Sequence, residues 1–208
     1  MHVVFDLDGV LLDSESDLSW LDRGLDGALS ECGVAATAEN RARLFPPTRE
    51  RLTDLAAEVG VSVETCWEIR NRHYTEAKLA AIRSGAIGPY PNVDVIAEMA
   101  GRYPLAIVSN SPQAVVDAFV EQAGLAEHFE YTVGRGTTLA DVERLKPHPH
   151  LYERLHAHTA ADDYVYVGDE DSDGEFASAT GMAFVHLDRE RGPVDSLAAV
   201  RDRVAALA

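Results

Sequence analysis

The sequence has very few lysines. Only Lys78 and Lys146 occur among its 208 residues, and the other sixteen basic residues are arginines. These 18 basic residues face 35 acidic ones, which gives a formal net charge of −17. A surface with this charge repels nucleic acid phosphates and anionic membranes, so neither is expected as a partner.

The shortage of lysine also bears on the environment of the protein. An acid-rich and lysine-poor surface is typical of proteins from halophiles that keep molar salt in their cytoplasm. At ~1 M salt the Debye length falls to about 3 Å, which relieves the repulsion among surface acids. The composition therefore favours a halophilic protein, with an ordinary acidic protein as the alternative.

Cysteine is scarce, and long apolar runs are absent. Cys32 and Cys66 lie far apart and form neither a CxxC pair nor a metal-binding spacing, so two buried, reduced thiols are expected. No apolar run approaches the ~18–20 residues of a membrane helix. The first ten residues, MHVVFDLDGV, lack the basic segment of a secretory signal. These features predict a cytoplasmic protein.

Short apolar runs alternate with helical patterns over most of the chain. Strands alternating with helices are typical of βαβ units, so we predict an α/β fold with a doubly wound, Rossmann-like parallel sheet. The expected strands are residues 2–5, 105–108, 131–133, 164–167 and 183–187. The expected helices of this part are residues 112–124, 149–157, 172–181 and 194–206.

One stretch breaks this alternation. Between residues 16 and 89 no convincing strand occurs, and the pattern predicts helices near 17–32, 38–45, 49–59 and 63–84. The segment GAIGPYP that ends this stretch has the glycines and prolines of a linker. We therefore predict an α/β core made of residues 1–15 and 90–208, with residues 16–89 inserted as a helical cap.

Polar side chains follow several of the predicted strands. In an open α/β sheet the carboxyl ends of the strands gather at one rim, where active sites form. Polar residues just after the strands that end at residues 5, 108 and 167 should therefore meet at this rim. A lysine that precedes the last of these strands should join them. The residues concerned are Asp6, Asp8, Gly9, Ser109, Asn110, Lys146, Asp169 and Asp173.

The carboxylates in this group predict a metal ion. Clustered carboxylates raise one another's pKa values unless a cation offsets their charge, and Mg²⁺ prefers carboxylate, water and phosphate oxygens. Asp6 and Asp169 are the expected direct ligands, together with the backbone carbonyl of Asp8. Asp173, one helical turn beyond Asp169, is expected to hold the ion through water.

Four ordered motifs resemble those of the haloacid dehalogenase-like hydrolases. The first is DLDGVLLDS from Asp6, and the second is SNS from Ser109. The third is KPHP from Lys146, and the fourth is VGDEDSD, which contains Asp169. Glu170 departs from the common pattern, because a small residue usually follows Asp169. The resemblance spans essentially the whole chain.

This resemblance implies a role for each matching residue. Asp6 would attack phosphorus and form an aspartyl-phosphate. Asp8 would protonate the leaving oxygen and then deprotonate the attacking water. Ser109 and Lys146 would bind phosphoryl oxygens. Because the dehalogenases of the family lack a second aspartate at the position of Asp8, this residue favours phosphoryl chemistry.

The resemblance also implies a class of substrate. Asn110 and Gly9 would contact the substrate or its phosphate, and a helical cap would close over them. Arg49, after the Pro46–Pro47 break, is the candidate for an anionic group of the substrate, with a helix-surface charge as the alternative. The expected substrate is a small phosphorylated metabolite, such as phosphoglycolate or a sugar phosphate. Both a monomer and a homodimer remain open.

Two other functions compete with a magnesium-dependent phosphatase. A phosphoryl transferase of the β-phosphoglucomutase type would share every motif and differ only in the acceptor of the phosphoryl group. A phosphate-binding or interaction module would keep the fold but would not turn over a substrate. Intact Asp6, Asp8, Lys146 and Asp169 argue against the second alternative. Glu170 and Asp171 are interpreted as solvated surface acids.

Overall fold

A computed structural model describes all residues from Met1 to Ala208, and the chain divides into two compact units. The core unit consists of Met1–Ser16, Ile87–Arg135 and Arg144–Ala208. The helical unit consists of Asp17–Ala86 together with Gly136–Glu143. The last segment comes from a region that the sequence assigned to the core.

The core unit is built on a five-stranded parallel sheet with the order β5-β4-β1-β6-β7. Its strands are β1 (His2–Phe5), β4 (Leu105–Pro112), β5 (Tyr131–Arg135), β6 (Tyr164–Gly168) and β7 (Ala183–His186). A separate antiparallel pair joins β2 (Leu12–Asp13) to β3 (Gly88–Pro89). The sequence analysis did not anticipate β2 and β3.

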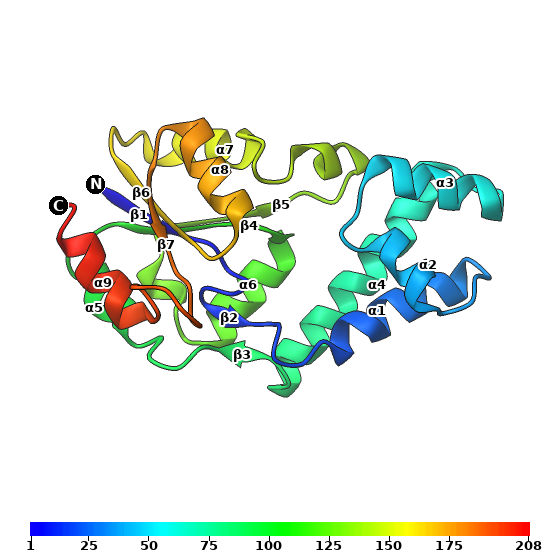
Figure 1. The fold of residues 1–208 in the computed structure, drawn as a ribbon, viewed down its shortest axis with the longest axis horizontal. Coiled ribbons are helices and arrows are strands. Elements are labelled where there is room, and N and C mark those ends of the chain that lie inside the picture. The colour runs from blue at the N-terminus through cyan, green and yellow to red at the C-terminus, as the bar shows by residue number, and fades with distance from the viewer. The chain divides into compact units, whose positions relative to one another are not determined.

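Helices cover both faces of this sheet (Figure 1). One face carries α7 (His150–Thr159) and α8 (Asp171–Thr180), and the other carries α5 (Val95–Ala100), α6 (Gln113–Gln122) and α9 (Leu197–Ala205). The strands are therefore covered on both sides, and every residue of β6 is buried. The predicted doubly wound parallel sheet is confirmed, although the sequence analysis did not anticipate α5.

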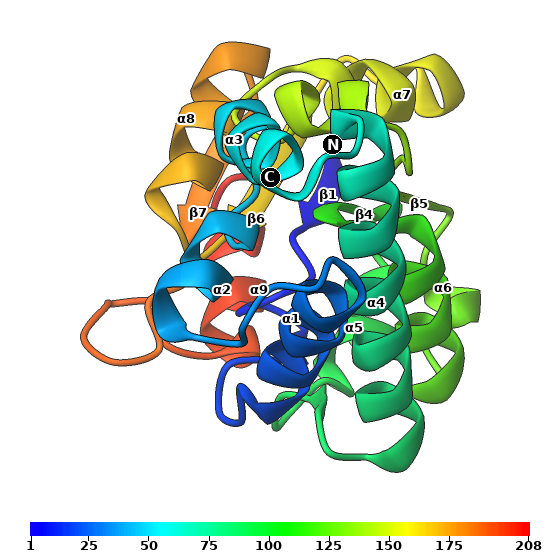
Figure 2. The ribbon, with the colours of Figure 1, turned by 90° about the vertical axis from the view of Figure 1, so that its right-hand side faces the viewer.

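The helical unit contains α1 (Ser19–Glu31), α2 (Ala38–Leu44), α3 (Arg49–Val59) and α4 (Val63–Ser84). Figure 2 shows α1 running beside α4, the longest helix of the chain. Local capping explains why these helices begin and end where they do. The side chains of Thr48 and Ser62 accept backbone N–H bonds at the starts of α3 and α4. Gly60 and Gly85 end the same helices in the left-handed conformation.

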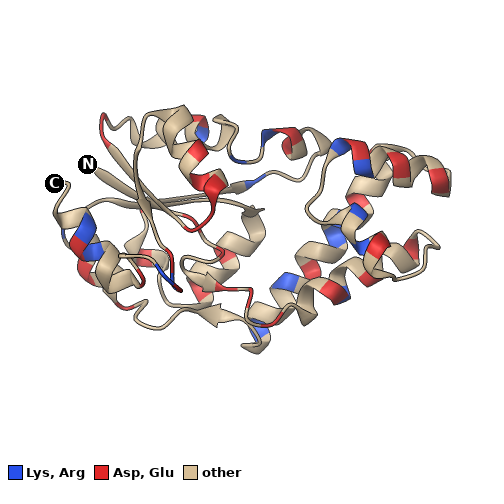
Figure 3. Ribbon diagram, viewed as in Figure 1, with Lys and Arg blue, Asp and Glu red and all other residues tan.

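Both lysines are buried, at 1% exposure for Lys78 and 7% for Lys146. The exposed basic side chains are therefore arginines and not lysines. Acidic residues occur on helices of both units (Figure 3). Cys66 is buried as expected, but Cys32 is only half-buried because it follows the exposed end of α1. No helix is both long enough and apolar enough to cross a membrane.

Candidate active site

The sheet order explains how distant residues meet. Strand β1 lies between β4 and β6, and the chain reverses its direction of travel across the sheet at β1. Such a switch point opens a crevice at the carboxyl ends of the strands. Asp6 directly follows β1, Asp169 directly follows β6, and Ser109 lies in the last half of β4. These three segments therefore deliver their polar residues to one rim.

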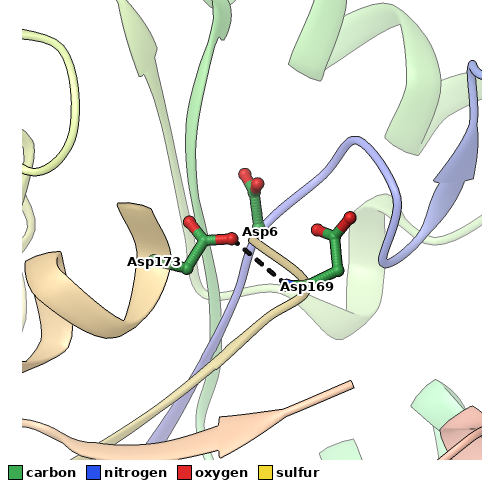
Figure 4. Close-up of side chains that lie close together, drawn as sticks. All are labelled: Asp6, Asp169 and Asp173. Atoms are coloured by element: carbon green, nitrogen blue, oxygen red, sulfur yellow. Dashed lines mark hydrogen bonds between the residues drawn. The ribbon is translucent and has the colours of Figure 1, made fainter. Parts of the chain in front are cut away.

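Three carboxylates gather at this rim (Figure 4). One oxygen from each of Asp6, Asp169 and Asp173 lies within 4.8 Å of the others. Asp6 and Asp173 are buried, and Asp169 is half-buried. Oxygen Oδ1 of Asp169 is buried and accepts no hydrogen bond. Oδ1 of Asp6 is likewise buried without a hydrogen bond, so two carboxylate oxygens of the cluster accept none.

Burial and mutual repulsion change the acidity of this cluster. Burial is the largest cause that raises the pKa of Asp6 to about 7; Asp173 and Asp8 add to the rise, and Lys146 opposes it. Burial likewise raises the pKa of Asp169 to about 8, and repulsion by Asp6 and Asp173 adds to the rise. A bound cation would reverse both effects, because it favours the ionised carboxylates.

Lys146 lies among the carboxylates. Its Nζ is 2.9 Å from Oδ1 of Asp6, 2.6 Å from Oδ1 of Asp173 and 2.8 Å from the hydroxyl of Tyr166. Burial alone would lower the pKa of the Lys146 ammonium, but Asp6 and Asp173 outweigh burial, and the pKa rises above its usual value. The lysine is therefore a charged, almost inaccessible counter-ion for two acids.

Asp173 has a different environment from the one expected. Its Oδ1 accepts from Lys146, and its Oδ2 accepts from the backbone N–H groups of Asp169 and Glu170, each at 3.2 Å. Figure 4 shows the bond to Asp169 as a dashed line. Both oxygens therefore hold protein groups in place, and the water-mediated contact with an ion stays a prediction. Glu170 is exposed and is the N-cap residue of α8.

Two serines orient Asp8. The hydroxyl of Ser14 donates to Oδ1 of Asp8 at 2.7 Å, and the hydroxyl of Ser111 donates to Oδ2 at 2.7 Å. Neither serine was assigned a role from the sequence, although both lie inside the quoted motifs. Each carboxylate oxygen of Asp8 is thus held in a defined direction, as a proton-transferring group requires.

The turn after Asp8 depends on Gly9 and Arg189. Gly9 has a φ of +72°, and a Cβ there would lie 2.0 Å from Oδ2 of Asp169, so only glycine fits. Arg189 donates to the carbonyls of Gly9 (3.1 Å) and Val10 (2.7 Å), and its guanidinium lies 3.6 Å from the ring centre of Tyr90. The sequence gives no signal for this contact, because it joins segments about 180 residues apart.

Ser109 and Asn110 also lie at the rim. Ser109 is buried, and its hydroxyl oxygen accepts from the backbone N–H of Ser111 at 3.1 Å. The side-chain oxygen of Asn110 accepts from the backbone N–H of Lys146 at 2.8 Å. Asn110 therefore fixes the segment that carries the lysine, in addition to any contact with a substrate.

Arg49 belongs to the helical unit, where it is the first residue of α3. Its Nε lies 3.0 Å from a carboxylate oxygen of Glu143, and its side chain is 42% exposed. This pairing matches the alternative of a helix-surface charge. A substrate-binding role for Arg49 stays a prediction.

Comparisons with known proteins agree with this geometry. The sequence profile of the family described as haloacid dehalogenase-like hydrolase matches residues 3–187. A phosphoglycolate phosphatase from Mesorhizobium japonicum is 32% identical over 207 residues, covering 89% of this chain and 82% of that protein. A phosphoglycolate phosphatase from Shigella boydii is 28% identical over 216 residues, covering 89% of this chain and 80% of that protein.

A solved structure shows the same fold. CbbY from Rhodobacter sphaeroides, in complex with phosphate, superposes with a TM-score of 0.69 at 20% identity. The match covers 94% of this chain and 91% of that chain. At this identity the likeness concerns the fold alone.

Proposed function

Because the chain belongs to the haloacid dehalogenase-like hydrolases and is a phosphatase of that family, we propose that it hydrolyses phosphomonoesters with Mg²⁺ through an aspartyl-phosphate on Asp6. The observation that carries this proposal is the position of Asp6. Its carboxylate stands at the end of β1 in contact with the Lys146 ammonium and within 4.8 Å of the carboxylate oxygens of Asp169 and Asp173.

The residues at the rim fit a hard divalent cation. Oδ1 of Asp169 is a buried oxygen without a hydrogen bond, and burial together with neighbouring carboxylates raises the pKa values of Asp6 and Asp169. All donors in the set are oxygens, which is the preference of Mg²⁺. Asp6, Asp169 and the backbone carbonyl of Asp8 would hold the ion directly. Asp173 would hold it through water. When bound, Mg²⁺ supplies positive charge for the phosphoryl oxygens.

The first half of the reaction uses Asp6 and Asp8. A carboxylate oxygen of Asp6 attacks phosphorus, the bond from phosphorus to the ester oxygen breaks, and Asp8 gives its proton to that leaving oxygen. In the second half Asp8 takes a proton from a water molecule, whose oxygen attacks the phosphorus of the aspartyl-phosphate. Asp6 is then restored and inorganic phosphate leaves. Ser14 and Ser111 hold Asp8 in place for both proton transfers.

Lys146 and Ser109 bind the phosphoryl group in this proposal. The ammonium of Lys146 offsets charge that is spread over the phosphoryl oxygens, and in a buried site such an interaction is stronger than in water. The Ser109 hydroxyl offers a further hydrogen bond, and Asn110 and Gly9 contribute at the substrate side. The helical unit would serve as the cap, with Arg49 as a candidate contact for an anionic group.

The substrate class is a small phosphorylated metabolite. Phosphoglycolate is the first choice because two relatives that match across most of the chain are phosphoglycolate phosphatases. Sugar phosphates come next. A panel of phosphorylated metabolites, assayed with Mg²⁺ at low and at molar KCl, would identify the substrate and test the expected adaptation to salt.

The decisive experiment replaces the nucleophile. Asp6→Asn should lose Mg²⁺-dependent hydrolysis of an aryl phosphate by at least about a thousandfold, since no covalent intermediate can form. Asp171→Asn is the matched control, because Asp171 is an exposed acid at the start of α8 and touches none of the proposed groups. Full activity of Asp6→Asn, with a fold unchanged by circular dichroism, would refute the mechanism.

A further inference from the structure

A buried tyrosine hydroxyl lies next to Lys146. Tyr166 on β6 is fully buried, and its hydroxyl oxygen accepts a hydrogen bond from Nζ of Lys146 at 2.8 Å. The same hydroxyl donates its proton to the backbone carbonyl of Val108 at 2.9 Å. Val108 directly precedes Ser109, so one hydroxyl joins the strand that carries the serine to the side chain of the lysine.

The direction of this bond is set by the surroundings. A phenol has a single proton. Of its two possible acceptors the Val108 carbonyl is nearer, at 2.9 Å against 3.4 Å for Oδ1 of Asp173, so the proton points to Val108 and a lone pair of the oxygen faces the ammonium. The hydroxyl therefore acts as an acceptor for Lys146.

Two of the three N–H groups of the Lys146 ammonium are hydrogen-bonded, one to Asp173 and one to Tyr166. The ammonium also forms an ion pair with Oδ1 of Asp6 at 2.9 Å, but this oxygen accepts no hydrogen bond. The third N–H is therefore the one that a phosphoryl oxygen can accept from, while Asp173 and Tyr166 hold the other two in buried bonds.

We propose that Tyr166 is a positioning residue, which with Asp173 anchors the Lys146 ammonium so that its third N–H can bind the phosphoryl group. This inference rests on the proposed function, because it assumes that Lys146 binds phosphate. Without the hydroxyl, the ammonium lacks one buried acceptor and the carbonyl of Val108 lacks its donor. The lysine then turns toward the carboxylates, and its ammonium binds phosphate more weakly.

The chain contains a matched control on the same strand. Tyr164 lies two residues earlier on β6, is also buried, and its hydroxyl is bonded to Thr159 (2.5 Å), to the backbone N–H of Ala161 (3.1 Å) and to His156 (3.1 Å). Tyr164→Phe therefore removes a buried, hydrogen-bonded hydroxyl from the same strand without touching the rim. Tyr166→Phe keeps the ring, which packs edge-on against Phe176 at 5.2 Å.

The test measures steady-state hydrolysis of an aryl phosphate and competitive inhibition by inorganic phosphate, with saturating Mg²⁺. For Tyr166→Phe we expect the inhibition constant of phosphate and the KM to rise roughly tenfold, as loss of a hydrogen bond to a charged group implies. For Tyr164→Phe we expect both constants to stay within about twofold of the parent, even if the melting temperature falls equally.

A purely structural role for Tyr166 would give a different pattern. A folding defect reduces the number of active molecules, which lowers kcat and leaves KM and the inhibition constant unchanged. That pattern, or equal changes in both tyrosine variants, would overturn the proposal. If Tyr166→Phe cannot be purified, Tyr166→Met removes the same hydroxyl and is measured in its place. If the parent protein shows no Mg²⁺-dependent hydrolysis, the proposed function itself has failed.

Discussion

The two buried lysines of this chain have different neighbours. Lys146, in the core unit, is surrounded by Asp6, Asp173 and the hydroxyl of Tyr166. Lys78, in the helical unit, lies with its Nζ 4.9 Å from the ring centre of Trp20 and 5.8 Å from that of Tyr74. Two carboxylates lie against the first ammonium, and two aromatic rings lie beside the second.

The two kinds of contact differ in strength. A π face attracts a cation by about 0.5–2 kcal/mol, whereas removing one member of a buried ion pair costs about 3–5 kcal/mol. The neighbourhood of Lys146 holds two such ion pairs, and it is also the one in which the carboxylate pKa values are strongly raised. The comparison can be tested with paired variants.

The largest effect is expected from replacing the lysines themselves. Lys146→Met should lower kcat/KM by at least about a hundredfold, because a positive group at the phosphoryl oxygens is lost. It should also lower the free energy of unfolding at neutral pH by about 3–5 kcal/mol, because Asp6 and Asp173 lose their counter-ion.

Lys78→Met keeps the length of the side chain and removes the cation–π contacts with Trp20 and Tyr74, which contribute about 0.5–2 kcal/mol to the free energy of unfolding. Urea denaturation of both variants checks the order of the two effects. A larger loss for Lys78→Met than for Lys146→Met would show that the comparison is wrong.

The next effect concerns two glycines with almost the same backbone conformation. Gly9 and Gly60 have φ values of +72° and +74°, but a Cβ on Gly60 would meet nothing within 4 Å. Gly60→Ala should therefore cost only the strain of the left-handed conformation, about 1–2 kcal/mol. Gly9→Ala adds a collision with the carboxylate of Asp169, and should raise the Mg²⁺ concentration needed for half-maximal activity about 10- to 100-fold.

Melting curves and magnesium titrations of Gly9→Ala and Gly60→Ala separate the two contributions. Equal magnesium requirements in both variants would mean that Asp169 does not hold the ion.

Stability is also expected to depend on pH, with opposite signs in the two units. In the core unit, burial raises the pKa of Asp6 to about 7 and that of Asp169 to about 8, against an ordinary value of 3.8. The folded chain therefore binds these protons more tightly than the unfolded chain. The resulting stability is complete below about pH 4 and is lost as pH rises through about 7–8.

In the helical unit the direction is reversed. Hydrogen bonds from Arg41 lower the pKa of Asp26, and hydrogen bonds from Arg72 and His73 lower the pKa of Glu31. Stability from these acids is present above their ordinary pKa values and is lost as pH falls through the lowered ones. Melting temperatures from pH 3 to 9 with a chelator, and again with excess Mg²⁺, test this prediction. Mg²⁺ should stabilise the protein most at high pH, and an equal gain at every pH would contradict it.

The smallest effect distinguishes the two cysteines. Burial raises the pKa of the Cys66 thiol to about 11, whereas Cys32 is half-buried, with burial and Glu31 raising its pKa as well. At pH 8 a thiol reagent should label Cys32 slowly and Cys66 only when the helical unit opens. Mass spectrometry of partly labelled protein checks the order, and faster labelling of Cys66 would show that its burial is transient.

Much of the fold could be predicted because its signals are local. The bounds of α4 follow from Ser62 at its start and Gly85 at its end, and β1 follows from a short apolar run before Asp6. The two-residue strands β2 and β3 were missed because two residues are too short to show a period.

The site was predicted less completely. The rule for carboxyl ends of strands, together with the family motifs, predicted that Asp6, Lys146, Asp169 and Asp173 would meet, and the structure places them within contact distance. The partners of these groups were not predictable in the same way. Tyr166 and Arg189 have no motif of their own, and their contacts depend on packing between segments distant in sequence.

The burial of both lysines has a practical consequence for handling the protein. Apart from the N-terminal amine, reagents that acylate or crosslink primary amines react with exposed lysine side chains, and this fold offers none. Succinimidyl dyes and amine crosslinkers should therefore leave the side chains of the folded protein unmodified, and trypsin can cut its surface only after arginine. Labelling of either lysine would then serve as a direct chemical report that its unit has opened.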